Sequence, residues 1–115
     1  MHELSIAMSI VELAQEESKR LGAERVEAVH LRVGALAGIV KDSLLFSYEM
    51  AAQDTELAGS RLVIEEVPGV VHCARCNAER PIESAQSCCC AECGTPALDV
   101  VSGRELQVTA LEVWP

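Results

Sequence analysis

The sequence predicts an α+β fold in which two helices pack on a small three-stranded sheet that carries an inserted zinc-ribbon-like module. Three observations support this prediction. Helical and strand patterns alternate along residues 1–69, all six cysteines lie within residues 70–100, and a further strand pattern follows them. A chain of 115 residues has room for one ordinary domain with a smaller module. Residues 1–69 and 101–115 are therefore expected to form an α/β domain, and residues 70–100 an insertion.

Two segments have the pattern of helices. Residues 3–21 repeat apolar side chains at helical spacing, and Gly22 follows as a stop signal. A second helix is predicted over about residues 41–52, with Asp42 or Ser43 near its start. The apolar face of the first helix is wide, which indicates that this helix packs on a sheet.

Three segments have the period-two pattern of strands, namely "RVEAVHLRVGAL" (residues 25–36), which the turn "GALAG" ends, and residues 61–67 and 103–114. In the last of them the apolar positions change parity near Ala110 and Leu111. This change predicts a β-bulge, or a strand end that is covered on both faces.

The composition limits the class of protein. Half of the residues are hydrophobic but only 3% are aromatic, so the core must consist of aliphatic side chains, with Phe46, Tyr48 and Trp114 as its few large members. The net charge of −9 argues against a nucleic-acid groove and against binding to an anionic membrane. No signal peptide or membrane-spanning run is recognisable, so we expect a cytoplasmic protein.

Cysteines of a cytoplasmic protein are more often metal ligands than disulfide partners. Two Cys-x-x-Cys pairs, Cys73 with Cys76 and Cys90 with Cys93, are separated by residues 77–89. Each pair can form a tight turn that presents two thiolates, and two such knuckles complete the tetrahedral shell of a structural zinc site. Gly94 suits the chain reversal after the second knuckle. The spacing therefore predicts Zn(II) held by these four cysteines.

Other interpretations of the module are weaker. A four-cysteine iron site is chemically possible, and a thioredoxin-like redox pair would leave the second pair unexplained. A nucleic-acid zinc ribbon is disfavoured because the module has a net charge of −2 before any thiolate is counted. Its charged side chains are Arg75, Arg80, Glu79, Glu83, Glu92 and Asp99.

Three further potential ligands lie beside the predicted zinc ligands. Cys88 and Cys89 are interpreted as small hydrophobic side chains under the second knuckle, although either could exchange with Cys90. His72, next to Cys73, could replace a thiolate, but a surface histidine is the favoured interpretation.

The chain begins Met1-His2-Glu3, and this end can also bind a metal. The α-amine, the deprotonated His2 amide nitrogen and the His2 imidazole could chelate Ni(II) or Cu(II), which favour nitrogen-rich tetragonal coordination. Glu3 could add a further donor, and Met1 is expected to be retained because histidine follows it. The positive end of a helix opposes a bound cation, so we expect modest, pH-dependent affinity.

Together, "MHELSIA", "VHLRVG", "CARC", "CAECG" and "SGRELQVTALEV" resemble the HypA/HybF family of nickel metallochaperones over essentially the whole chain. The resemblance implies a nickel-binding domain with an inserted zinc-binding domain. It implies nickel at Met1, His2 and Glu3 and zinc at Cys73, Cys76, Cys90 and Cys93. It further implies delivery of nickel to the large subunit of [NiFe]-hydrogenase together with a HypB-type GTPase, and in some organisms service to urease through its accessory proteins.

The chain departs from the family pattern at two positions. Cys88 stands where an aromatic residue is common, and Ala91 where the second knuckle often has proline. Both changes would loosen the packing of the knuckle without altering its ligand set.

Two alternative functions stay open at the level of sequence. A zinc-ribbon adaptor for protein interactions would need no nickel. An enzyme or redox protein is disfavoured because the sequence has no Ser/His/Asp set, phosphate loop or open metal motif. Either a monomer or a homodimer is compatible with the predicted edge strands.

Overall fold

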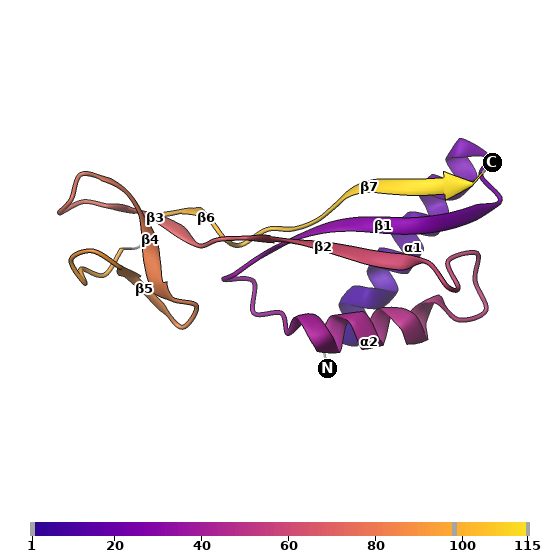
Figure 1. Ribbon diagram of the computed structural model, residues 1–115, viewed down its shortest axis with the longest axis horizontal. Helices are drawn as coiled ribbons and strands as arrows, with labels where there is room; N and C mark the ends of the chain where they lie inside the picture. Colours follow the sequence, from indigo (N-terminus) through magenta and orange to yellow (C-terminus); the bar gives the residue numbers. More distant parts are fainter. Residues whose placement is uncertain (1, 98, 115) are drawn as a thin grey trace. The chain divides into compact units, whose positions relative to one another are not determined.

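The computed structural model describes residues 2–97 and 99–114 and has the predicted α+β composition (Figure 1). All five elements predicted outside the cysteine module are present. The complete order is α1 (His2–Leu21), β1 (Arg25–Gly34), α2 (Lys41–Ala52), β2 (Arg61–Val67), β3 (Val70–Cys73), β4 (Ala78–Ser84), β5 (Ser87–Cys90), β6 (Asp99–Ser102) and β7 (Leu106–Trp114).

The strands form two sheets. In the first, β1 is the central strand of the order β2-β1-β7, and in the second the order is β5-β4-β3-β6 (Figure 1). The four strands of the second sheet were not apparent from the sequence. Three of them span four residues each, too few for a period-two pattern, and buried cysteines end two of these three strands.

Helix α1 buries one stripe of small and aliphatic side chains and ends where the sequence predicts. Gly22 has a φ of +68°, and the Ala23 N–H donates to the Ser18 carbonyl at 3.0 Å, which closes the last turn. Lys19 and Arg20 lie in that turn, where the helix dipole favours cations. The buried stripe comprises Ala7, Ile10, Val11, Ala14 and Ser18.

Helix α2 differs from the prediction at its start. Its N-cap is Val40, which makes no side-chain cap, so Asp42 and Ser43 lie in the first turn without capping it. Its buried residues, Leu44, Tyr48 and Ala52, recur every four positions, and the Tyr48 hydroxyl bonds with the Ser60 hydroxyl at 2.6 Å.

The expectation that three aromatic residues belong to the core was wrong for two of them. Tyr48 is buried, but Phe46 and Trp114 are 65% and 58% exposed. Phe46 lies two residues from Leu44 and from Tyr48, which places it on the opposite face of α2. Trp114 is the last residue of β7. Aliphatic residues of β1 instead form much of the core: Val26, Ala28, Val29, Leu31 and Val33.

The chain divides into two compact units. The first contains both helices with most of β1, β2 and β7, and the second comprises Arg32–Gly38 and Glu65–Gln107. The predicted module limits, residues 70 and 100, fall inside this second unit. Among the described residues, no helix combines the length and apolarity needed to cross a lipid bilayer.

The last residues of β1 belong to the second unit. At this end the Gly34 N–H donates to the Glu105 carbonyl at 2.8 Å, and the Ala35 N–H donates to the Val67 carbonyl at 2.9 Å. Beyond it the two flanking segments pair directly, with Val70 opposite Ser102 in the β3–β6 ladder. A Cβ at Gly34 would lie 2.0 Å from the Gly103 carbonyl oxygen, so only glycine allows this approach.

Replacing Gly34 with alanine is therefore expected to lower the free energy of unfolding by about 3 kcal/mol, because backbone must move to accept the methyl group. Gly38→Ala is the control. Gly38 has a φ of +73°, but no atom lies within 4 Å of where its Cβ would stand, so the methyl group itself meets nothing and the expected cost is backbone strain of about 1 kcal/mol. Urea denaturation of both variants measures the difference, and equal midpoints would contradict the close approach at Gly34.

Candidate metal centres

The four predicted zinc ligands come from two knuckles that follow strands. Cys73 ends β3 and Cys90 ends β5, and Cys76 and Cys93 lie in the turns that follow. The residue after each turn cysteine has a left-handed backbone, with φ of 53° at Asn77 and 74° at Gly94. The predicted role of Gly94 is thereby confirmed. Asparagine tolerates this conformation better than most residues, so Asn77 could have been used to predict the chain reversal after the first knuckle.

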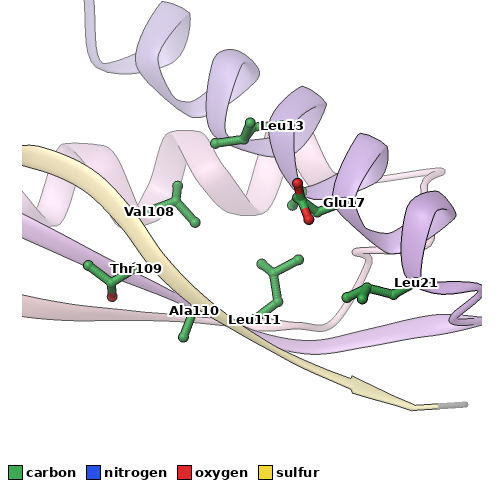
Figure 2. Close-up of a pocket in the computed structure, with 8 residues that line it drawn as sticks. Leu13, Glu17, Leu21, Val108, Thr109, Ala110 and Leu111 are labelled. Carbon is green, nitrogen blue, oxygen red and sulfur yellow. The ribbon is translucent and has the colours of Figure 1, made fainter.

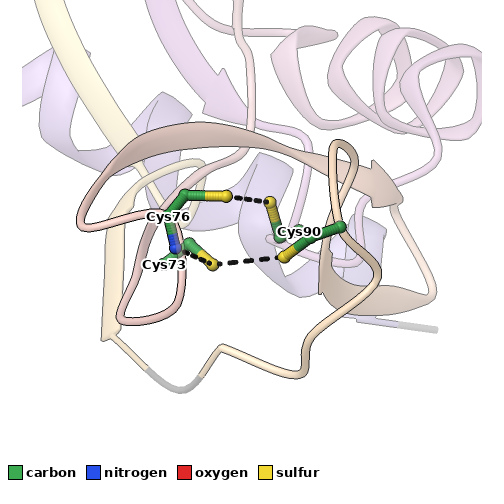
Figure 3. Close-up of side chains that lie close together, drawn as sticks. Cys73, Cys76 and Cys90 are labelled. Atoms are coloured by element: carbon green, nitrogen blue, oxygen red, sulfur yellow. Dashed lines mark hydrogen bonds between the residues drawn. The ribbon is translucent and has the colours of Figure 1, made fainter.

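The four sulfur atoms converge on one point. All lie within 4.8 Å of one another, and two of the contacts join one knuckle to the other. The Sγ atoms of Cys73 and Cys93 are 3.6 Å apart. Those of Cys76 and Cys90 are 3.9 Å apart (Figure 3). Zn–S bonds of about 2.3 Å place tetrahedral sulfurs about 3.8 Å apart. The donor set therefore fits zinc and leaves no position for a catalytic water.

Hydrogen bonding prepares these thiols unequally for metal binding. The Cys76 N–H donates to the Cys73 sulfur at 3.4 Å, and the Cys93 sulfur bonds with the Thr95 hydroxyl at 3.2 Å. The Thr95 contacts lower the pKa of Cys93 to about 6. Contact with Cys93, together with burial, raises the pKa of Cys76 to about 11. A metal must therefore displace protons as the cluster closes.

The neighbouring candidate ligands lie outside this cluster. Cys88 and Cys89 are half-buried residues of β5, and the Cys88 carbonyl accepts a hydrogen bond from the Ala97 N–H at 3.0 Å. His72 is half-buried in β3, where Glu79 and Asp99 are its partners in the flanking strands.

The structure describes two of the three residues of the amino-terminal candidate site. Met1 lies outside the described residues, and His2 is the first residue of α1, with a side chain that is 65% exposed. The Glu3 side chain is only 13% exposed, and its Oε2 lies 3.5 Å from His2 Nε2. The two side chains predicted to serve nickel are thus neighbours in space.

Glu3 has a second contact that the sequence did not reveal. Its Oε2 accepts a hydrogen bond from the N–H of Val40 at 3.2 Å, at the start of α2. This bond is the main cause of a lowered pKa at Glu3, and the charge of His2 adds to it. An acid that accepts the N-cap N–H is one half of a capping box, here supplied from another helix. Glu3 thereby links the first turns of α1 and α2.

A groove of about 370 Å³ lies between α1 and β7, and its lining is mostly apolar (Figure 2). Leu13 and Leu21 face Val108 and Leu111 across it. Thr109 and Ala110, between these two strand residues, are both exposed. The ionisable side chain in the lining is Glu17, which is paired with Arg20 at 2.7 Å. The groove therefore holds no set of metal ligands.

Comparison with known proteins identifies the relatives of this chain. The family described as "Hydrogenase/urease nickel incorporation, metallochaperone, hypA" matches residues 1–113. Hydrogenase maturation factor HypA of Chloroflexus aurantiacus is 51% identical over 97% of this chain and 98% of its own length. That of Geobacter metallireducens is 46% identical, over 98% and 99% respectively.

A solved structure has the same fold. The solution structure of the Ni metallochaperone HypA from Helicobacter pylori superposes with a TM-score of 0.66 and covers 97% of each chain at 19% identity. A second solution structure of a HypA protein gives a TM-score of 0.69 at 21% identity, covering 98% of this chain and 96% of its own.

Proposed function

Because the chain belongs to the HypA family of hydrogenase and urease nickel-incorporation metallochaperones, we propose that it binds Ni(II) at its amino terminus and delivers it for [NiFe]-hydrogenase maturation. The observation that carries this proposal is the placement of His2 and Glu3 together in the first turn of α1. The protein acts as a carrier and not as an enzyme. Nickel is its cargo, and zinc is its resident metal.

The proposed nickel donors are the Met1 amine and the amide nitrogen and imidazole of His2. Coordination by amide nitrogens in the first helical turn costs the helix none of its i→i−4 hydrogen bonds, because the first four N–H groups make none. The exposed His2 imidazole can reach a metal from the solvent side. The positive end of α1 opposes the cation, which suits a site that must release its cargo.

Glu3 is proposed to orient the site, whereas the sequence left open whether its carboxylate binds nickel. Its carboxylate already accepts the Val40 N–H, and its charge lies beside the positive ends of both helices. This charge partly offsets the dipole that opposes a bound cation.

Glu3→Gln should therefore keep one nickel per chain, with affinity reduced by less than about fivefold, because the amide oxygen can still accept the Val40 N–H. Glu3→Ala loses both the acceptor and the charge and should bind more weakly than Glu3→Gln. Calorimetric titration with nickel measures both variants. A glutamine variant as defective as the alanine variant would instead identify the carboxylate as a ligand.

Zn(II) is proposed to be held by Cys73, Cys76, Cys90 and Cys93, where it supplies a cross-link between the two knuckles and no reaction chemistry. In this proposal residues 70–100 form the zinc-binding module. Residues 1–69 and 101–115 form the nickel-binding domain, whose two helices pack on the three-stranded sheet.

The proposed partners are a HypB-type GTPase and the large subunit of [NiFe]-hydrogenase, with urease accessory proteins in some organisms. These exchanges take place in the cytoplasm, with the carrier as a monomer or a homodimer.

Metal analysis and nickel titration of protein with a native, untagged amino terminus test the function. The proposal requires one zinc per purified chain and one further nickel on titration. A protein that retains zinc but takes up no specific nickel would be a zinc-ribbon adaptor for protein interactions.

A further inference from the structure

Arg80 lies on the face of the second sheet that carries two of the four cysteines. Along β4, Ala78, Arg80 and Ile82 are half-buried, whereas the residues between them are exposed. Residues directly opposite each other in antiparallel strands point to the same face. The opposed pairs on this face are Cys73 with Ala78, Val71 with Arg80, and Ile82 with Cys90. Arg80 is therefore placed between one ligand from each knuckle.

The guanidinium group of Arg80 is incompletely satisfied. Its Nη1 donates to the Glu79 carbonyl at 3.4 Å, but its Nε is buried and has no hydrogen-bond partner among the described residues. Buried N–H groups without an acceptor are rare in native proteins. A thiolate on the same face of the sheet, which carries Cys73 and Cys90, would give this side chain the acceptor that it lacks.

The charge of the assembled cluster provides a reason for a cation at this place. Zinc with four thiolates carries about two formal negative charges. Cys73 and Cys90 are fully buried, and burying uncompensated charge is costly. The module's other arginine, Arg75, is exposed within the first knuckle, so water already screens its charge.

We propose that Arg80 is the counter-ion of the zinc–thiolate cluster and lowers the reactivity of its thiolates toward electrophiles. This inference rests on the proposed zinc site. A cationic donor beside a thiolate withdraws charge from the sulfur and makes it less nucleophilic, while the ligand set is unchanged. Arg80 therefore positions and protects a ligand but is not itself a ligand.

The test is the rate at which zinc leaves the folded, zinc-loaded protein when excess N-ethylmaleimide alkylates the thiolates, followed with a colorimetric zinc chelator. Arg80→Gln is expected to release zinc about tenfold faster than the parent, the order expected for loss of one charge-assisted hydrogen bond. The matched control, Arg75→Gln, removes the same charge from the same module and should stay within about twofold of the parent.

Arg80→Lys separates the effect of charge from that of shape, because lysine keeps the positive charge but lacks the planar guanidinium group. It should recover most of the protection, and it should retain zinc even if Arg80→Gln cannot be loaded. Equal release rates for Arg80→Gln and Arg75→Gln, or a lysine variant no better than glutamine, would overturn the counter-ion role alone. A parent protein that purifies without zinc would overturn the metal site as well, and the two failures are thereby distinguished.

Discussion

Replacing Cys90 with serine is expected to abolish zinc binding and unfold the second sheet, while the helical signal of α1 and α2 persists. Cys90 is fully buried, ends β5 and pairs with Cys76 across the cluster, so its loss opens the link between the knuckles. Structural zinc contributes about 10–16 kcal/mol of binding free energy in zinc-finger peptides, far more than four short strands can replace. Zinc analysis and far-ultraviolet circular dichroism measure the two effects.

Cys88→Ser and Cys89→Ser are matched controls for this experiment. Both change a half-buried cysteine of the same strand, but neither sulfur belongs to the described cluster. Each variant should retain one zinc per chain. If Cys88→Ser or Cys89→Ser lost zinc while Cys90→Ser kept it, the ligand in β5 would be assigned to the wrong residue.

Replacing His2 with alanine is expected to remove nickel binding from calorimetric titrations while zinc content and fold stay unchanged. The imidazole is the one side-chain nitrogen in the proposed donor set, and its chelate ring fixes the geometry that Ni(II) prefers. Because His2 is 65% exposed, its truncation removes little packing. His30→Ala and His72→Ala delete the other two histidines of the sequence and should bind nickel as the parent does.

A short peptide extension placed before Met1 tests whether the Met1 α-amine is a nickel donor. It converts the α-amine into an amide without altering any side chain, and it should weaken nickel binding as His2→Ala does. Unchanged affinity in the extended protein would remove the amine from the donor set, and unchanged affinity in His2→Ala would refute the amino-terminal site itself.

The parts of the fold that the sequence revealed are those with long periodic patterns. The limits of α1, α2, β1 and β2 follow from apolar spacing and from glycine stops, because each element buries one continuous face. The cysteine cluster was equally readable, since its ligand spacing is local. Strands β3, β5 and β6 were missed because each spans only four residues, and cysteines occupy inward positions of β3 and β5.

Features that depend on distant contacts could not be read in this way. Glu3 and Val40 are separated by 37 positions in the sequence, so the cap that Glu3 supplies to α2 appears only in three dimensions. Arg80 looks like an ordinary surface arginine until the β3–β4 register places it opposite buried Val71. Phe46 looked like a core residue because its size was considered without its angle on the helix.

The pairing of Val70 with Ser102 has a consequence for the order of folding. Strand β7, an edge of the first sheet, is the last element in the chain, and residues 68–105 separate it from β2. If residues 68–105 were unstructured, pairing β7 with β1 would close them into a long flexible loop at a cost in entropy. Once β3 and β6 are paired, most of that loop is already closed. The last of the four cysteines precedes β7 in the chain, so the second sheet can form before β7 pairs with β1.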